Sequence, residues 1–390
     1  MSFLDEAQDL FEYTRDMRRD FHMHPEIGLK EIRTANIIAN ELNNLGIAVK
    51  TGIGQTGVIG ILKGKAPGPV ILLRFDMDAL PVNEETGAEY ASVNQGVMHA
   101  CGHDGHVAIG LSVARILDNH KDEFNGTVKL MFQPGEEGLG GAEQMIADGV
   151  LRDPKPDVAL SMHVWNEKPV GWIGIVPGPV MAAADKFTVR IIGKGGHGAV
   201  PNLCNDPILA ASQVVNLLQG IVSRNVSPLK SAVVTVTAIH GGDAFNVIPS
   251  DVIMKGTLRS FEPEIRDLVH KRFRQIIEDT AHAFDCKAEI EIQSITPALI
   301  NHPDITLHVQ KVAESLFKKD ELDYKTPTLG SEDMAFVFQQ VPGCYIFIGS
   351  ANKEMNLDAS HHSAKFNFDE TILPKAVGLM ATAAMELLNS

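Results

Sequence analysis

The sequence predicts an α/β protein, in which an α/β/α sandwich domain carries an inserted ferredoxin-like βαββαβ domain. Two observations support this class. Short runs of consecutive apolar residues alternate with longer segments whose apolar residues recur at helical spacing, and this alternation is typical of layered α/β domains. A segment of different texture follows from about residue 185, where strand and helix patterns come in the order β-α-β-β-α-β.

The sandwich domain takes several helices and most of its strands from the first part of the chain. Helical spacing of apolar residues predicts helices over 3–21, over 31–46, where Gly46 is the stop signal, and over 106–120. Other runs are apolar at consecutive positions, which is typical of strands covered on both faces. These predicted strands cover 57–62, 69–75, 127–133, 157–164 and 344–350.

The middle of the chain accounts for the inserted domain. Its predicted elements are a strand over 186–194, a helix over 206–222, strands over 231–240 and 251–261, a long amphipathic helix over 262–284 and a strand over 287–295. After about Thr296 the chain returns to helices and one apolar strand. We therefore expect residues 1–184 and 297–390 to form one discontinuous domain, with 185–296 inserted into it.

Composition excludes several classes of partner. The formal charge of −15 argues against nucleic acid and anionic membranes. The N-terminus is charged throughout and lacks the apolar core of a signal peptide, and no uninterrupted apolar stretch is long enough to span a bilayer. The four cysteines are too scattered for a disulfide framework, so we expect a cytoplasmic protein in a reducing compartment. They are Cys101, Cys204, Cys286 and Cys344.

Two glycine-rich stretches resemble phosphate-binding loops and are rejected. Residues 52–57, "GIGQTG", match the spacing of a dinucleotide-binding loop, but a strand-like segment follows where that loop requires a helix. Residues 193–198, "GKGGHG", lack the ending of a P-loop. We expect a turn between two strands at 52–57 and no nucleotide site.

Ligand-type side chains follow several predicted strands at the point where each strand ends. Asp76 and Asp78 follow the second strand, the adjacent Glu136 and Glu137 follow the third, and His163 ends the fourth. Cys101 and His103 lie in "HACGHDGH", a loop that leads into a helix. In an open α/β sheet the carboxyl ends of the strands form one edge, so these groups are expected to converge.

Each of these residues also has an ordinary interpretation. Cys101 alone could be a small buried residue, His103 could line a loop, and the paired glutamates and aspartates could be turn residues. Together, however, so many polar groups in an apolar setting need compensation. A divalent cation provides it and explains why thiolate, imidazole and carboxylate occur together. One of two adjacent glutamates could then bind metal while the other serves as a base.

Five motifs across the chain resemble one known family. They are "RFDMDALP", "HACGHDGH", "QPGEEG", "MHVW" and "HHSAKFNFDE". These motifs are similar to those of the di-metal amidohydrolases related to hippurate hydrolase, the aminoacylases and the plant auxin-conjugate hydrolases. The resemblance covers essentially the whole chain. It implies a catalytic α/β domain with an inserted ferredoxin-like domain that serves as lid and dimerisation domain.

The resemblance also implies a ligand set. It assigns two divalent ions, with zinc, manganese, cobalt and nickel all admissible, to Cys101, His103, Glu137, His163 and His362. Glu136 would be the general base, and Asp78 would steady a metal-binding histidine. Ala364 stands where the family motif has proline, so His361 stays open as an alternative to His362.

Three residues of the inserted segment match lid positions of the family. His197 resembles a histidine that stabilises the oxyanion in the neighbouring subunit, which implies a homodimer or homotetramer. Asn246 and Arg259 resemble residues that grip the carboxylate of the substrate. His197 as a structural loop histidine and Arg259 as a surface residue stay open as alternatives.

The resulting prediction is a metal-dependent amidohydrolase that cleaves N-acyl-L-amino acids into a carboxylic acid and a free amino acid. A metallo-carboxypeptidase or dipeptidase of the same superfamily would use the same ligands, so the motifs do not separate the two. A non-catalytic binding protein and a structural zinc protein are disfavoured, because the ligands are accompanied by a spare carboxylate base, Glu136.

Overall fold

The computed structural model describes residues 2–389 and divides the chain into two compact units. The first unit comprises residues 2–180, Ile300–Pro327 and 333–389. The second comprises Met181–Leu299 and Thr328–Glu332. That 1–184, 185–296 and 297–390 are the functional domains stays a prediction.

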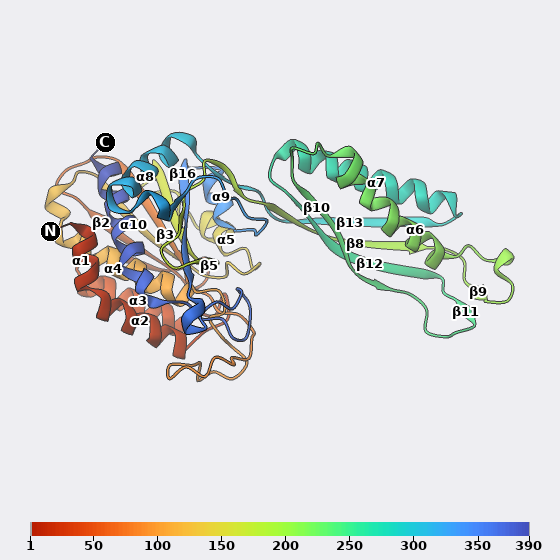
Figure 1. The fold of residues 1–390 in the computed structure, drawn as a ribbon, viewed down its shortest axis with the longest axis horizontal. Coiled ribbons are helices and arrows are strands. Elements are labelled where there is room, and N and C mark those ends of the chain that lie inside the picture. The colour runs from red at the N-terminus through yellow and green to blue at the C-terminus, as the bar shows by residue number, and fades with distance from the viewer. Residues whose placement is uncertain (1, 390) are drawn as a thin grey trace. The chain divides into compact units, whose positions relative to one another are not determined.

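A sheet of eight strands forms the centre of the first unit (Figure 1). Strands β4, β3, β5 and β16 run parallel to one another in its middle, because every step between them is a parallel pairing. Their near-continuous burial matches the apolar runs of the sequence. In sheet order the strands are β1 (Ala48–Ile53), β2 (Gly57–Lys63), β4 (Thr127–Gln133), β3 (Val70–Asp76), β5 (Val158–Pro169), β16 (Gly343–Ala351), β6 (Ile173–Gly174) and β15 (Leu322–Asp323).

Helices cover this sheet. Figure 1 shows α4 and α10 on one side of the strands and the short α5 and α9 on the other. The helix α4 is buried along almost its whole length, as the apolar pattern of its sequence requires. The helices of the unit are α1 (Phe3–Asp9), α2 (Phe11–Met23), α3 (Ile32–Asn44), α4 (His103–Asn119), α5 (Gly141–Ala147), α8 (Pro303–Leu316), α9 (Met334–Phe338) and α10 (Leu373–Leu388).

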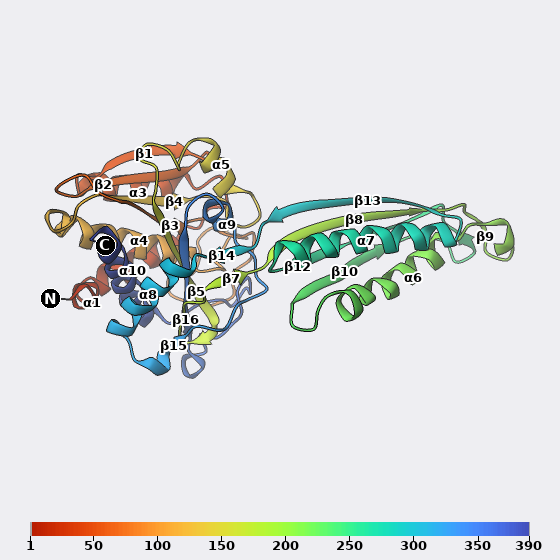
Figure 2. The same cartoon turned by 90° about the horizontal axis from the view of Figure 1, so that it is seen from above.

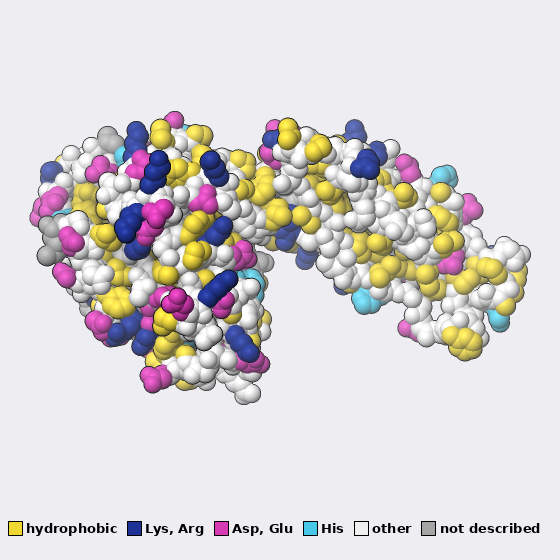
Figure 3. Space-filling model, viewed as in Figure 1, with side chains coloured by type: hydrophobic (Ala, Val, Ile, Leu, Met, Phe, Trp, Pro, Cys, Tyr) yellow, Lys and Arg dark blue, Asp and Glu magenta, His cyan; other side chains and the backbone are white. Residues whose placement is uncertain are grey.

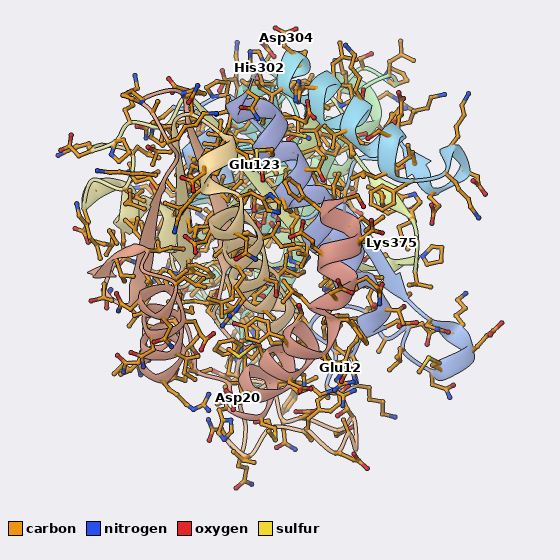
Figure 4. All side chains as sticks on the ribbon, turned by 90° about the vertical axis from the view of Figure 1, so that its left-hand side faces the viewer. Glu12, Asp20, Glu123, His302, Asp304 and Lys375 are labelled. Carbon is orange, nitrogen blue, oxygen red and sulfur yellow. The ribbon has the colours of Figure 1, made fainter. Side chains whose placement is uncertain are left out.

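Residues Glu370–Leu388, which include α10, are long and apolar enough to cross a membrane by length and composition alone. The segment is nevertheless 72% buried inside the protein. It packs against α1, α4 and α8. The Lys375 side chain near its start, labelled in Figure 4, pairs with Glu321. These contacts are those of a core helix.

The second unit is built on a four-stranded antiparallel sheet with the order β10-β12-β8-β13. Figure 2 shows α6 and α7 running along this sheet. The main elements follow the order β-α-β-β-α-β: β8 (Ala183–Ile192), α6 (Pro207–Gly220), β10 (Ala232–His240), β12 (Asp251–Ser260), α7 (Pro263–Ala283) and β13 (Lys287–Thr296). Two further sheets have two short strands each. One pairs β9 (Gly196–His197) with β11 (Val247–Ile248), and the other pairs β7 (Gly178–Met181) with β14 (Leu299–Asn301).

The mixed α/β class and the five predicted strands of the first unit are confirmed. Residues 52–57 span the end of β1, a turn over 54–56 and the start of the antiparallel strand β2, as expected for a turn and not for a nucleotide-binding loop. The single helix predicted over 3–21 is wrong in one respect. The chain breaks at Leu10, whose ψ of 1° is not helical, into α1 and α2.

One fully buried cation joins neighbouring parts of the first unit. Arg74 on β3 donates to Gln133 on β4 at 2.9 Å and to Asp76 at 2.6 Å. It also donates to Asp333, just before α9, at 3.1 Å. Since Arg74 and Asp76 have no exposed surface, each charge depends on the other for compensation.

Replacing Arg74 with methionine should therefore lower the free energy of unfolding by about 3–5 kcal/mol, because it removes the cation that compensates the buried carboxylates of Asp76 and Asp333. Urea unfolding followed by circular dichroism measures this loss. The matched control is R190M, which removes an exposed arginine ion-paired to Asp251 on a strand of the second unit and should change stability little. An R74M midpoint equal to that of the wild type would contradict the role of Arg74.

Candidate metal centre

The ligand-type residues converge because the strands that carry them are neighbours. Asp76 ends β3, His163 lies in β5 beside it, and Glu136 and Glu137 follow β4 on the other side. The loop that carries Cys101 and His103 reaches the same edge of the sheet through Gly102. This glycine has a φ of +94° and caps α4 immediately before His103. A Cβ at Gly102 would lie 2.3 Å from Val164 of β5, so glycine allows the close approach.

Several groups of donor atoms lie with all their atoms within 4.8 Å of one another, and three of these groups contain the predicted ligands and Glu136. The Cys101 sulfur lies 3.5 Å from Nε2 of His163. Nε2 of His362 lies 3.1 Å from Oε1 of Glu137. The structure thus brings together every residue that the family resemblance assigned to the metals, with Glu136 beside them. The three groups are Cys101, His103 and His163; Cys101, Glu137 and His362; and His103, Glu136 and Glu137.

The chemistry of these donors fits a divalent cation. Nε2 of His103 is buried and has no hydrogen-bond partner among the described residues. Burial alone would lower the pKa of His103, but the carboxylates of Asp76 and Asp78 raise it to about 10. Burial and the nearby glutamates raise the pKa of the Cys101 thiol well above its usual value. The site therefore favours added positive charge, and a cation could replace both protons.

Asp78 orients His103 toward this cluster. Nδ1 of His103 donates to the Asp78 backbone oxygen at 2.9 Å and lies 3.2 Å from its carboxylate. The other carboxylate oxygen of Asp78 accepts the backbone N–H of Glu137 at 3.1 Å. With Nδ1 engaged, Nε2 of His103 is the atom left to bind a metal.

His106 lies close to the donors but has both ring nitrogens occupied. Its Nε2 accepts the backbone N–H of Val164 at 3.0 Å, so its Nδ1 carries the proton and donates to Asp76. Burial would raise the pKa of Asp76, yet Arg74 and His103 hold it well below its usual value. Asp76 is therefore an anion, and it contacts Arg74 and His106 next to the donor atoms.

The two adjacent histidines His361 and His362 differ in the partners of their ring nitrogens. Nε2 of His361 accepts the backbone N–H of Asn166 at 3.0 Å, and its Nδ1 lies 3.7 Å from the Cys101 sulfur. His362 has a φ of +65°, which turns the chain so that its ring faces Glu137. Only His362 of the two belongs to the donor groups.

A further buried network behind the site escaped the sequence analysis. Arg18 of α2 is fully buried and donates to Asp104 at 2.8 Å, where Nδ1 of His22 also lies at 2.8 Å. The Arg18 guanidinium lies between the rings of Tyr90 and Phe368. Burial would raise the pKa of Asp104, but Arg18 and His22 lower it. The sequence did not predict burial of Arg18, because it lies in the charged run "RDMRRDF", which is typical of an exposed helix face.

The predicted lid residues lie in the second unit. His197 on β9 is exposed and pairs with Val247 of β11, and the backbone oxygen of Asn246 accepts the N–H of Gly198 at 2.8 Å. His197 and Asn246 are therefore neighbours. Arg259 lies near the opposite end of β12 from these loops, so this unit by itself does not bring all three together. Burial lowers the pKa of Arg259.

Comparison with known proteins places this site in a family. The family described as Peptidase family M20/M25/M40 matches residues 72–386. The chain is 40% identical to the N-acetyl-L-cysteine deacetylase of Bacillus subtilis, over 96% of this chain and 88% of that protein. It is 36% identical to the hippurate hydrolase of Campylobacter jejuni over the whole of both chains. It is also 36% identical to thermostable carboxypeptidase 1 of Saccharolobus solfataricus, over 99% of this chain and 98% of that one.

A solved structure agrees with these relatives. The YxeP protein of Bacillus subtilis, described as a dinuclear metal binding peptidase from the M20 family, superposes with a TM-score of 0.86 at 33% identity, over 98% of this chain and 99% of that one. The resemblance inferred from the five motifs is thus confirmed, and the chain is a hydrolase of amide bonds. The fold, the matched residues and these relatives show that the chain belongs to peptidase family M20/M25/M40.

Proposed function

We propose that the protein hydrolyses N-acyl-L-amino acids to a carboxylic acid and a free amino acid at a centre of two divalent ions. The observation that carries this proposal is the division between two adjacent glutamates. Glu137 belongs to the donor group of Cys101 and His362, whereas Glu136 meets the proposed ligands only in the group of His103 and Glu137. A carboxylate that holds a cation next to one that can move a proton is the pairing that amide hydrolysis requires.

In this proposal Cys101, His103, Glu137, His163 and His362 hold the ions, which are zinc, manganese, cobalt or nickel. When bound, the ions would supply Lewis acidity that polarises the amide carbonyl and makes water a stronger acid. The donor set mixes sulfur, nitrogen and oxygen, so the residues alone do not select one metal. The relative YxeP, described as a dinuclear metal binding peptidase, supports the number of ions.

The side chains then carry the protons. Glu136 accepts a proton from water as the oxygen attacks the amide carbon, and it donates this proton to the departing nitrogen as the C–N bond breaks. Asp78 keeps His103 in the orientation that its hydrogen bonds define. In the proposal, His197 stabilises the oxyanion, and Asn246 and Arg259 bind the substrate carboxylate, for which the guanidinium fork is suited.

The proposal includes a homodimer or homotetramer in the cytoplasm, with the inserted segment as lid and dimerisation domain. The ring of His197 is exposed, and within its own unit its Nδ1 accepts the backbone N–H of Ala199. Strand β10 is an edge of its sheet, and apolar side chains on it and on α6 are exposed, namely Ile208, Leu209, Leu217 and Ile239. Figure 3 shows apolar side chains on this unit. The four free cysteines are consistent with a reducing compartment.

The alternative is a metallo-carboxypeptidase or dipeptidase, and the similarity to thermostable carboxypeptidase 1 favours it. A side-by-side assay of hippurate, N-acetyl-methionine and a panel of dipeptides separates the two. We expect kcat/KM to be higher for the acyl amino acids. A higher kcat/KM for the dipeptides would contradict the proposal and support the alternative.

Replacing Cys101 or His103 with alanine should reduce the bound metal below two ions per chain, because each change removes a donor from the cluster. Elemental analysis after loading and desalting measures the stoichiometry. The control is C204A, since Cys204 lies in the second unit outside the donor groups. Two ions retained by both C101A and H103A would overturn the ligand assignment.

Replacing Glu136 with glutamine should lower kcat about 100- to 10,000-fold while the metal content stays at the wild-type value, because only the proton carrier is lost. Steady-state kinetics and elemental analysis on the same sample test both parts. E143Q, at an exposed position of α5, is the matched control and should leave kcat unchanged. Near-normal turnover by E136Q would exclude Glu136 as the base.

A further inference from the structure

His361 occupies a fixed position beside the donor cluster. Its ring packs against two aromatic rings, with centroid distances of 5.1 Å to Trp165 and 4.9 Å to Phe366 and an interplanar angle of 34° in both cases. Its Nε2 accepts the backbone N–H of Asn166 at 3.0 Å. The ring is thus packed against two aromatic rings and held at one nitrogen.

Asn166, which provides this contact, is itself held firmly. Its side-chain amide donates to the backbone oxygens of Ala359 at 2.9 Å and Asn367 at 2.8 Å. Its side-chain oxygen accepts the hydroxyl of Ser350 at 2.8 Å. Asn166 is 3% exposed, so its backbone N–H is a rigid donor that His361 meets in one orientation.

This contact decides which nitrogen of His361 carries the proton. A backbone N–H only donates, so Nε2 must be the unprotonated nitrogen and Nδ1 bears the hydrogen. Nδ1 lies 3.7 Å from the Cys101 sulfur, within hydrogen-bond range for sulfur. The sulfur is therefore the acceptor, and the bond becomes charge-assisted when the sulfur is a thiolate.

We propose that His361 is a positioning residue for Cys101, and not a metal ligand. Its Nδ1–H donates to the Cys101 thiolate while the thiolate binds a divalent ion, which fixes the direction of the sulfur and draws electron density from it. A less electron-rich sulfur donates less to the cation and leaves the cation a stronger Lewis acid. This inference rests on the proposed ligand role of Cys101.

Two variants separate the contacts of His361. In H361N the side-chain nitrogen can occupy the place of Nδ1, so a donor to sulfur is kept while the acceptor for Asn166 is lost. In H361Q the side-chain oxygen can reach the place of Nε2, so the acceptor for Asn166 is kept while the donor to sulfur is lost. Thermal unfolding by circular dichroism shows whether each variant is folded.

The test is the absorption spectrum of the full chain loaded with Co²⁺, in which a thiolate ligand gives a sulfur-to-cobalt charge-transfer band. The band in the wild type is assigned by its loss in C101A. We expect the band to move to lower energy in H361Q, because the sulfur electrons are no longer stabilised by a hydrogen bond. H361N should keep the band near the wild-type position.

The outcomes distinguish this inference from the proposed function. A Cys101 band at the same energy in the wild type and H361Q would overturn the hydrogen bond and leave the ligand set intact. A shift in H361N alone would assign the effect to the Asn166 contact, and equal shifts in H361N and H361Q would assign it to neither contact by itself; both results would overturn the role of the Nδ1 donor. Absence of a Cys101 band from the wild type would overturn the ligand role of Cys101 and this inference together.

Discussion

The site depends on one constraint, which is that charge buried at the carboxyl end of the parallel strands must be compensated where it lies. Arg74 has no exposed surface and its charge meets Asp76 and Asp333 within 3.1 Å. Asp76 in turn receives the Nδ1 proton of His106. Polar groups this deep are costly without partners, so the network holds β3 and its neighbours in one arrangement. The donor cluster is built on that rigid support.

The same constraint decides which imidazoles can bind metal. Nδ1 of His103 is taken by Asp78, and Nδ1 of His163 by the backbone oxygen of Val164, so both rings offer Nε2 to the cluster. His106 has partners at both nitrogens, whereas His361 has Asn166 at Nε2 and the Cys101 sulfur at Nδ1, the same sulfur that lies beside Nε2 of His163. Hydrogen bonds thus occupy both ring nitrogens of His106, while His163 and His361 each keep one nitrogen beside the Cys101 sulfur, and of these two only His163 belongs to a donor group.

Much of this could be predicted from the sequence, because strands covered on both faces leave runs of consecutive apolar residues. The polar residues that follow those runs lie at one edge of the sheet, so Glu136 and His163 could be predicted as site residues. The break at Leu10 could not be predicted, since both helices continue the same apolar spacing. Arg18 looked like one more surface charge, although Arg74 stood within an apolar run and so carried a signal.

The family motif favoured His362 over His361, but the sequence offered no physical reason for that choice. The two are the same residue type at adjacent positions, and a turn with positive φ at His362 sends their rings to different partners. A contact with the backbone of Asn166, far away along the chain, determines which nitrogen of His361 is protonated. Such contacts depend on the assembled fold and not on local sequence preference.

X-ray absorption at the zinc edge of the zinc-loaded enzyme tests the central claim most directly. Cys101, His103, Glu137, His163 and His362 as ligands predict a sulfur neighbour at about 2.3 Å together with nitrogen and oxygen neighbours at about 2.0–2.2 Å. The sulfur contribution should vanish in C101A. A wild-type spectrum that requires only nitrogen and oxygen neighbours would contradict the account.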